Sequence, residues 1–297
     1  MIFFFKVLLS YFLFLGSTEV IAQSPKLDWG LILPAGSESR LSHFTSVAAE
    51  KGVKSVALYS AHFDKYKRNP AELKDHLKRY KIHEVVLNGG EMARVISESD
   101  LMHIDSMGMF LDQIGGDFLT FTSRKRDSYP PGKDELIQIG KNLDMIAQRL
   151  KKYGVKVVFG NQVNTICQTA DELQVISDAS SKKVLLMLDV ANFVQAGSNP
   201  ASFATLSKKR IKILVLQGLV TPKPGFAGPK LLNFQLVDLG SNLSKIDYKL
   251  FFSELKKANV KAIGLLKTVE FQDIESFQKS FASQIGYLEK EFRFSFK

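Results

Sequence analysis

The chain has 297 residues, of which 45% are hydrophobic and 24% are charged. This composition is typical of a folded globular protein and excludes a disordered tail, a collagen-like fibre and, because Cys167 is the only cysteine, an intramolecular disulfide bond. Lysine and arginine number 40 against 30 acidic residues, a formal net charge of +10, so the protein should attract anions at low salt.

The N-terminal segment has the pattern of a secretory signal peptide. Lys6 precedes an apolar run over Val7–Leu15, and small and β-branched residues follow. An uncleaved membrane anchor is the alternative, but Lys6 and Glu19 interrupt a stretch that would need about 20 apolar residues to span a bilayer. We therefore expect a signal peptide at residues 1–22, no stable membrane span after cleavage, and a secreted or periplasmic protein whose residues 23–297 form one domain.

Eight short β-rich runs follow, separated by helical patterns. The runs are Leu27–Leu33, Val53–Tyr59, His83–Leu87, Asp117–Thr122, Val155–Phe159, Val184–Leu188, Ile211–Leu216 and Val260–Leu266. Most of them are continuously apolar, which is typical of strands that are buried on both faces of a parallel sheet.

The segments between the strands carry apolar residues at three- and four-residue spacing. The clearest is Glu135–Tyr153, which presents one apolar stripe and one charged face, and Gly154 ends it. Asp247–Ala258 and Asp273–Phe292 repeat the pattern, and each is opened by an aspartate that can cap the first helical turn.

Eight strand–helix units in a chain of this length predict an α/β fold, a single-domain (β/α)8 TIM barrel, which is usually about 250 residues long. A doubly wound sheet in two halves is the alternative. It would better explain a Pro/Gly linker near the middle or a glycine-rich phosphate-binding motif after the first strand, and neither is present. The Pro- and Gly-rich stretch Val220–Pro229 follows the seventh strand, where we expect an ordered surface loop or, alternatively, a lid.

In a barrel of this kind, the active site forms at the carboxyl ends of the strands. The residues at those predicted ends include Ser60, His62, Asn88, Ser123, Arg124, Gly160, Asn161, Gln162, Asp189, Asn192, Gln217, Lys267 and Glu270. The polar side chains among them are the candidates for a functional site.

Four segments carry a resemblance to a known family, one of them Ala196–Pro200 (AGSNP), and the other three are more specific. Gly154–Gln162 (GVKVVFGNQ) looks like a strand that ends in Glu-Asn-His, Leu188–Asn192 (LDVAN) is similar to Asp-Thr-Gly-His, and Arg210–Gly218 (RIKILVLQG) is similar to Arg-Ile-x-x-Val-His-Leu-Lys-Asp. In this order and spacing, from about Gly115 to Phe292, the chain resembles the xylose-isomerase-like barrels. This superfamily contains sugar phosphate isomerases and epimerases.

The resemblance implies a divalent metal held by Glu, Asp, His and Glu from four late strands. Those positions fall on Gly160, Asp189, Val215 and Lys267, and only Asp189 keeps a ligand side chain. No histidine follows His103, so no shift of the alignment supplies the missing His. One carboxylate does not hold an ion that prefers several oxygen or nitrogen donors, so we predict no metal and no other cofactor.

Asp189 and Lys267 are the candidate catalytic residues. Two interpretations are open. In the first, Asp189 and Lys267 form an ion pair that only neutralises a former metal pocket. In the second, Asp189 acts as a base and Lys267 binds an anionic group. The candidate substrate-binding residues are Asn161, Asn192, Gln162, Gln217, Arg124 and His62. For Arg124 and His62, a position on a solvated surface loop is the alternative.

The resemblance implies an exported sugar phosphate isomerase/epimerase-like protein that acts on or binds a carbohydrate or an acidic sugar derivative. If it is active, it is isomerase-, epimerase- or lyase-like. The alternative is a non-catalytic pseudoenzyme that binds a carbohydrate or a protein, because three of the four ligand positions have changed. A nucleic-acid role, as in the apurinic endonucleases of the same fold, is disfavoured because that chemistry needs His and carboxylate ligands. The oligomeric state stays open.

Overall fold

The computed structural model describes residues 25–34, 36–127, 130–221, 233–269 and 271–296. Eight parallel strands close into a barrel in the order β1-β10-β7-β6-β5-β4-β3-β2. The strands are β1 (Leu27–Ile32), β2 (Ser55–Leu58), β3 (Glu84–Met92), β4 (Phe118–Ser123), β5 (Lys156–Gly160), β6 (Leu185–Asp189), β7 (Ile211–Leu216) and β10 (Ala262–Leu266). Each overlaps its predicted run, with β3 continuing past the predicted end at Leu87 to Met92, so the predicted barrel is confirmed. The predicted signal peptide at 1–22 lies outside the described residues.

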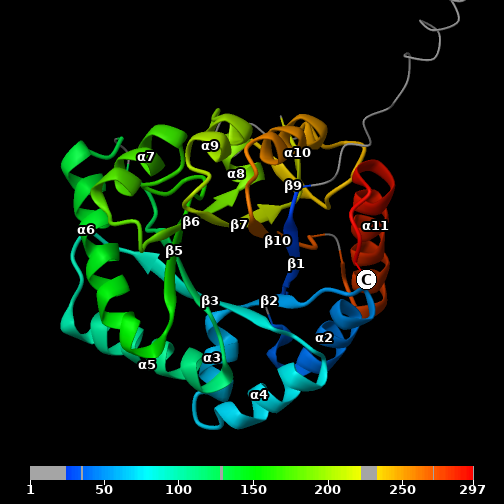
Figure 1. Cartoon of the computed structure of the whole chain (residues 1–297), viewed down its shortest axis with the longest axis horizontal. Helices are drawn as coiled ribbons and strands as arrows, with labels where there is room; N and C mark the ends of the chain where they lie inside the picture. The colour runs from blue at the N-terminus through cyan, green and yellow to red at the C-terminus, as the bar shows by residue number, and fades with distance from the viewer. Residues whose placement is uncertain (1–24, 35, 128–129, 222–232, 270, 297) are drawn as a thin grey trace, which may run out of the picture.

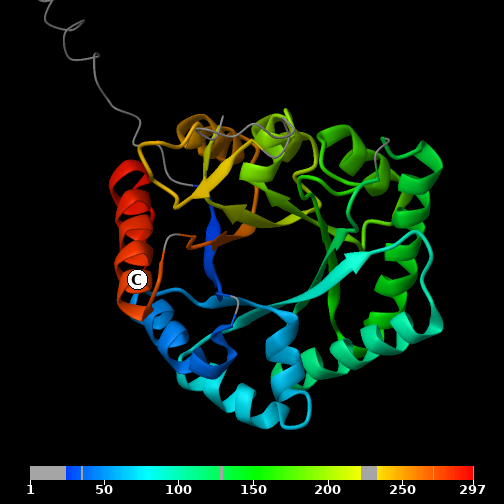
Figure 2. The ribbon, with the colours of Figure 1, turned by 180° about the vertical axis from the view of Figure 1, so that it is seen from behind.

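Helices surround the barrel on its outer side (Figure 1). They are α2 (Leu41–Glu50), α3 (Ser60–Tyr66), α4 (Pro70–Arg79), α5 (Glu98–Ile114), α6 (Lys133–Leu150), α7 (Ala170–Ala179), α8 (Val190–Gln195), α9 (Pro200–Leu206), α10 (Tyr248–Lys257) and α11 (Ile274–Phe292), with short 3-10 helices at Ser37–Arg40 and Lys151–Tyr153. The last helix lies beside the first one, as the reverse view also shows (Figure 2), and Phe277 of α11 packs edge-on against Phe44 of α2 with ring centroids 4.8 Å apart. This contact closes the ring of helices.

The helix ends follow the predicted local chemistry. The Asp247 carboxylate accepts a hydrogen bond from the Leu250 amide (2.9 Å), and Asp273 accepts one from the Ser276 amide (2.8 Å). Gly154 has a φ of 69°, a left-handed conformation that favours glycine, and it leads directly into β5. None of the helices in the described ranges is long and apolar enough to cross a membrane.

The core has two parts because each strand is buried on both faces. Side chains inside the barrel form one cluster, and those between the strands and the helices form a larger one. The inner cluster consists of Val86, Phe118, Val158, Ile213, Val215, Ile263 and Leu265. It fills the lower barrel, and a cavity lies above it toward the carboxyl ends of the strands.

A small antiparallel hairpin was not predicted. It pairs β8 (Gly218–Val220) with β9 (Gln235–Val237), which lie between β7 and α10 in the chain. The stretch Val220–Pro229, predicted to be a loop or lid, therefore begins in a strand, and its remainder from residue 222 on lies outside the described residues.

Candidate functional site

A cavity of about 250 Å3 opens at the carboxyl ends of the barrel strands. Seven of the barrel strands and the residues directly after β5 contribute to its lining, which consists of Ile32, Ala57, Leu58, Tyr59, Val86, Asn88, Thr120, Thr122, Asn161, Gln162, Met187, Asp189, Asn192, Val215, Leu265 and Lys267. The apolar residues of this set belong largely to or pack against the inner core, so they form the floor. Five predicted site residues therefore meet in one cavity: Asn161, Gln162, Asp189, Asn192 and Lys267.

Asp189 is the last residue of β6 and is only 7% exposed. Its Oδ1 accepts a hydrogen bond from the Asn192 amide (3.0 Å), which caps the first turn of α8. Burial raises the pKa of the Asp189 carboxyl, and the positive charge of Lys267 and the hydrogen bonds from Asn192 and Gln217 oppose that rise. The carboxylate is thus a buried acceptor at the edge of the cavity.

Gln217 lies behind Asp189 rather than in the cavity lining. Its Nε2 donates to both carboxylate oxygens of Asp189, at 3.2 and 3.1 Å, and the residue is fully buried. The Tyr248 hydroxyl holds the Gln217 backbone, because it donates to the carbonyl (2.8 Å) and accepts from the amide (3.2 Å). The predicted substrate contact of Gln217 is therefore replaced by a contact with Asp189.

The amides of Asn161 and Asn192 hold the ends of β5 and β6 together. Asn161 Nδ2 donates to the Asp189 carbonyl (3.1 Å), and Asn161 Oδ1 accepts from the Asp189 amide (2.9 Å). Asn192 Oδ1 accepts from the Val163 amide (3.3 Å). These bonds use both polar groups of the Asn161 side chain, so its main role in this structure is to fix the cavity wall.

Lys267 follows β10 directly, and its amide donates to the Leu216 carbonyl (3.2 Å). Its side chain lines the cavity together with Asp189. Within the described part of the chain, no hydrogen bond or ion pair joins the Lys267 ammonium to another group, and the possible ion pair with Asp189 is not formed. Both Asp189 oxygens instead accept hydrogen bonds from Gln217 Nε2.

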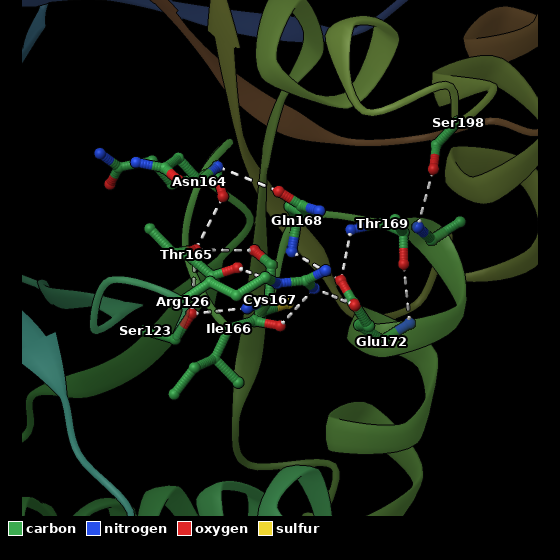
Figure 3. A network of polar contacts seen from close by, with 12 residues as sticks. Ser123, Arg126, Asn164, Thr165, Ile166, Cys167, Gln168, Thr169, Glu172 and Ser198 are labelled. Atoms are coloured by element: carbon green, nitrogen blue, oxygen red, sulfur yellow. Dashed lines mark hydrogen bonds and ion pairs between the residues drawn. The ribbon is translucent and has the colours of Figure 1, made fainter. Parts of the chain in front are cut away.

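The loop after β5, residues 161–169, is tied to the loop after β4 by Arg126 (Figure 3). Arg126 Nε donates to the Thr165 carbonyl (3.1 Å), and Nη2 donates to the Ile166 carbonyl (3.1 Å). Nη2 also pairs with Glu172 at the start of α7, and both side chains are largely buried. The ion pair and the two hydrogen bonds of Arg126 hold in place the loop that carries Asn161 and Gln162, two residues of the cavity lining.

Ser123 at the end of β4 adds a second tie to the same loop (Figure 3). Its Oγ accepts from the Cys167 amide (2.7 Å) and donates to Thr165 Oγ1 (3.0 Å), which in turn donates to the Gln162 carbonyl (2.7 Å). Asn164 takes a left-handed φ of 63° within the turn. The position of Gln162 at the cavity therefore depends on contacts from the neighbouring strand.

Arg124 does not line the cavity. Its guanidinium lies 3.5 Å from Asp127 and 3.5 Å from Glu135, the latter at the start of α6. These two carboxylates draw the side chain outward, which leaves the predicted contact of Arg124 with a substrate without structural support.

His62 also lies away from the cavity and is fully buried. The Tyr59 amide donates to His62 Nδ1 (3.2 Å), which assigns the ring proton to Nε2, 3.0 Å from Ser37 Oγ. Burial lowers the pKa of His62, and Glu38 and Lys65 act on it with opposite signs. The residue caps α3 and supports Tyr59 instead of facing a ligand.

We expect His62 to make the protein less stable in acid. Because the folded state holds this imidazole neutral, the unfolded chain binds more protons as the pH falls below about 6.5, and the free energy of unfolding decreases. Urea unfolding at about pH 7 and about pH 5 should show a smaller decrease for His62→Gln than for the wild type. The exposed-site control His83→Gln should match the wild type, and an equal decrease in all three proteins would contradict this assignment.

Sequence reasoning missed Thr120 and Thr122. Both lie on β4 and face the cavity, together with Tyr59 after β2. A signal was present in the sequence, since FLTFTS places polar side chains at every second position of an otherwise apolar strand. This period of two indicates a strand with one polar inner face.

The four positions that align with the family's metal ligands do not fit a divalent ion. A Cβ added to Gly160 would lie 2.5 Å from Met187 Cε, so Met187 fills the space of a ligand side chain there. Val215 is apolar, and Lys267 carries a charge that repels a dication. Asp189 alone supplies a carboxylate, whereas such ions need several oxygen or nitrogen donors.

Across the described ranges, no group of three or more His, Cys, Asp and Glu side chains could hold a metal ion. Glu270, the remaining acidic residue at the predicted strand ends, lies outside those ranges. The described residues therefore provide no set of ligands for a metal ion, and no reaction step is assigned to one.

A closed eight-stranded parallel barrel with a polar cavity at its carboxyl ends defines a TIM barrel protein. Residues 46–286 match the xylose isomerase-like TIM barrel family, and the chain belongs to that family. The resemblance drawn from the sequence is thereby confirmed. No curated protein sequence matches the chain.

Solved structures share the fold at low sequence identity. The IOLI protein with a bound zinc atom has 14% identity and a TM-score of 0.72, with 90% of this chain and 100% of that chain covered. A sugar phosphate isomerase/epimerase from Parabacteroides distasonis has 12% identity and a TM-score of 0.65, with 93% and 96% covered. A xylose isomerase-like TIM barrel/4-hydroxyphenylpyruvate dioxygenase fusion protein has 12% identity and a TM-score of 0.70, and this chain spans 89% of its own length and 43% of the fusion.

Proposed function

We propose that this protein is an exported barrel that binds, and acts on, a single carbohydrate unit without a divalent metal. The observation that carries the proposal is the cavity at the carboxyl ends, which combines an apolar floor with hydroxyl, amide, carboxylate and ammonium groups. A sugar ring matches such a lining, because its C–H faces are apolar and its hydroxyls need hydrogen-bond partners. Membership of the xylose isomerase-like family supports the same ligand class.

The cavity volume limits the size of the ligand. Pockets that enclose drug-sized molecules begin at about 300 Å3, and this cavity measures about 250 Å3. It therefore suits one monosaccharide or a derivative of it, with any longer chain left outside. The polar groups without a side-chain partner in the described structure, Tyr59, Thr122, Gln162 and Lys267, are the ones available to sugar hydroxyls.

An isomerase- or epimerase-like reaction needs a base for a proton next to a carbonyl and a positive group near the oxygen that gains charge. Asp189 is the candidate base, since burial raises the pKa of its carboxyl toward the range in which proton transfer is efficient. Lys267 is the candidate for the positive group, because its ammonium lines the same cavity.

A non-catalytic carbohydrate-binding barrel is the second candidate. The observation that favours it is the pair of hydrogen bonds from Gln217 Nε2 to both oxygens of Asp189. A carboxylate held in this way has fewer free lone pairs to accept a proton from a substrate. In this second candidate, Asp189 fixes the cavity wall and orients the ligand without a reaction.

Thermal unfolding of the purified protein with sugars, sugar acids and sugar phosphates tests the binding proposal. A ligand that binds the folded state raises the unfolding temperature, so we expect at least one monosaccharide to do so. Thr122→Phe should abolish this shift because its ring fills the cavity mouth, whereas the matched control Thr122→Ser keeps the hydroxyl and should keep most of the shift. No shift with any sugar would overturn the proposal.

Proton exchange separates the two candidates. An enzyme that removes a proton next to a carbonyl incorporates deuterium into the bound sugar in D2O, which NMR detects. Incorporation that is lost in Asp189→Asn supports catalysis, and binding without incorporation supports the non-catalytic barrel.

Export is a separate part of the proposal and rests on residues 1–22, which the described structure does not include. N-terminal sequencing of the protein from a secreting cell tests it. A mature chain that begins at Gln23 supports export, and an intact Met1 would contradict cleavage.

A further inference from the structure

From the state of Lys267 we infer that the cavity selects a sugar that carries one anionic oxygen group, a carboxylate or a phosphate, over the neutral sugar with the same ring. This inference rests on the proposed function, because it specifies the ligand of the same cavity.

The Lys267 ammonium faces the cavity with its three N–H donors unused. Within residues 25–34, 36–127, 130–221, 233–269 and 271–296, it makes no hydrogen bond and no ion pair. Its backbone is fixed by the hydrogen bond to the Leu216 carbonyl, next to β7. An ammonium with unused donors at a cavity wall is the arrangement that a carboxylate or a phosphate oxygen completes.

Asp189 is the only acid among the described residues of the cavity lining, and although its charge and that of Lys267 attract each other at a distance, the two side chains form no ion pair. Its two oxygens already accept hydrogen bonds from Gln217 Nε2 and from the Asn192 amide. Gln217 is fully buried, and Tyr248 holds its backbone from both sides, so this amide cannot follow Asp189 toward the lysine. Turning Asp189 toward Lys267 would therefore break three hydrogen bonds in a buried place.

The rest of the wall favours an anion as well. The remaining polar side chains of the lining are neutral, so no second carboxylate repels a negative ligand. Tyr59, Asn88 and Thr122 provide further donors within the same cavity, on β2, β3 and β4 or directly beyond. The net charge of +10 increases the local concentration of anions around the protein.

A charge-assisted hydrogen bond in a partly enclosed pocket corresponds to an affinity gain of about ten- to hundredfold. We therefore expect the anionic sugar to bind about ten- to hundredfold more tightly than its neutral parent. Added salt should reduce the ratio, because ions screen a partly exposed pair.

Isothermal titration calorimetry on the full-length protein tests this ratio. The probes are three members of one series, glucose, glucuronate and glucose 6-phosphate, and the corresponding galactose series. Lys267→Gln should bring the ratio of anionic to neutral affinity close to one. Lys125→Gln is the matched control, because it removes the same charge from an exposed loop residue outside the cavity lining, and it should keep the wild-type ratio.

The outcomes separate this inference from the proposed function. Tighter binding of the sugar acid alone identifies a carboxylate ligand, and tighter binding of the phosphate alone identifies a phosphate ligand. Equal affinity for neutral and anionic sugars, or a ratio that survives Lys267→Gln, overturns the inference while carbohydrate binding stands. If no member of either series binds, and none of the wider set of sugars shifts the unfolding temperature, both proposals fail.

Discussion

Replacing Arg126 with methionine should lower the free energy of unfolding by about 3 kcal/mol, the cost of leaving one partner of a buried ion pair alone. The Arg126 and Glu172 side chains are 17% and 14% exposed, so water does not replace the lost partner. The same substitution also removes the donors to two carbonyls of the loop after β5. Urea unfolding measures the loss, and a change below about 1 kcal/mol would contradict the buried-bridge description.

The double variant Arg126→Met with Glu172→Gln is the control for this prediction. Glu172 Oε2 also accepts hydrogen bonds from the Gln168 and Thr169 amides, and a glutamine oxygen can keep these capping bonds. Without an unpaired buried carboxylate, the double variant should recover part of the stability that Arg126→Met loses. A double variant less stable than Arg126→Met would show that the charge pairing is not the main contribution.

The wild-type protein should bind no stoichiometric Mn2+, whereas a variant with the family's four ligands restored should bind one ion per chain. The restoring changes are Gly160→Glu, Val215→His and Lys267→Glu, which join Asp189 to give four donor side chains. Met187→Ala must accompany them, because a side chain at position 160 would collide with the Met187 methyl group.

Calorimetric titration with Mn2+ measures this gain, and two variants act as controls. Adding Asp189→Asn to the restored protein should remove the binding, because it takes away the one retained carboxylate. Gly160→Glu without Met187→Ala should be less stable than the wild type by about 1–3 kcal/mol, the usual cost of overpacking. A stoichiometric ion in the wild type that is lost in Asp189→Asn would refute the predicted loss of the metal site.

The barrel was predictable because its signals are local. Strands buried on both faces are continuously apolar, helices between them show a period of 3.6, and the aspartates at 247 and 273 act within three residues of their own position. The small hairpin of β8 and β9 was missed because each of its strands has only three residues, too few for a periodic pattern.

The site was predictable only in part. Because Asn161, Asp189 and Lys267 follow predicted strands directly, the sequence was enough to predict that they lie at one cavity. It was not enough for Arg124, whose direction depends on carboxylates in the following loop and helix, nor for His62, which turns inward to cap its own helix. A side chain's direction at a strand end depends on partners that a single strand does not reveal.

The sequence by itself determined the class of fold and the edge of the barrel that carries the cavity, and it placed Gly160, Val215 and Lys267 at three of the four positions that the resemblance assigns to metal ligands. Only the tertiary structure decided how the remaining groups are used. Gln217 and Asp189 are 28 residues apart, and Gln217 and Tyr248 are 31 apart, so their hydrogen bonds exist only after the barrel has closed. Those bonds satisfy the buried Asp189 carboxylate, as a buried acceptor requires, while the Lys267 ammonium makes no hydrogen bond or ion pair with any residue that the structure describes.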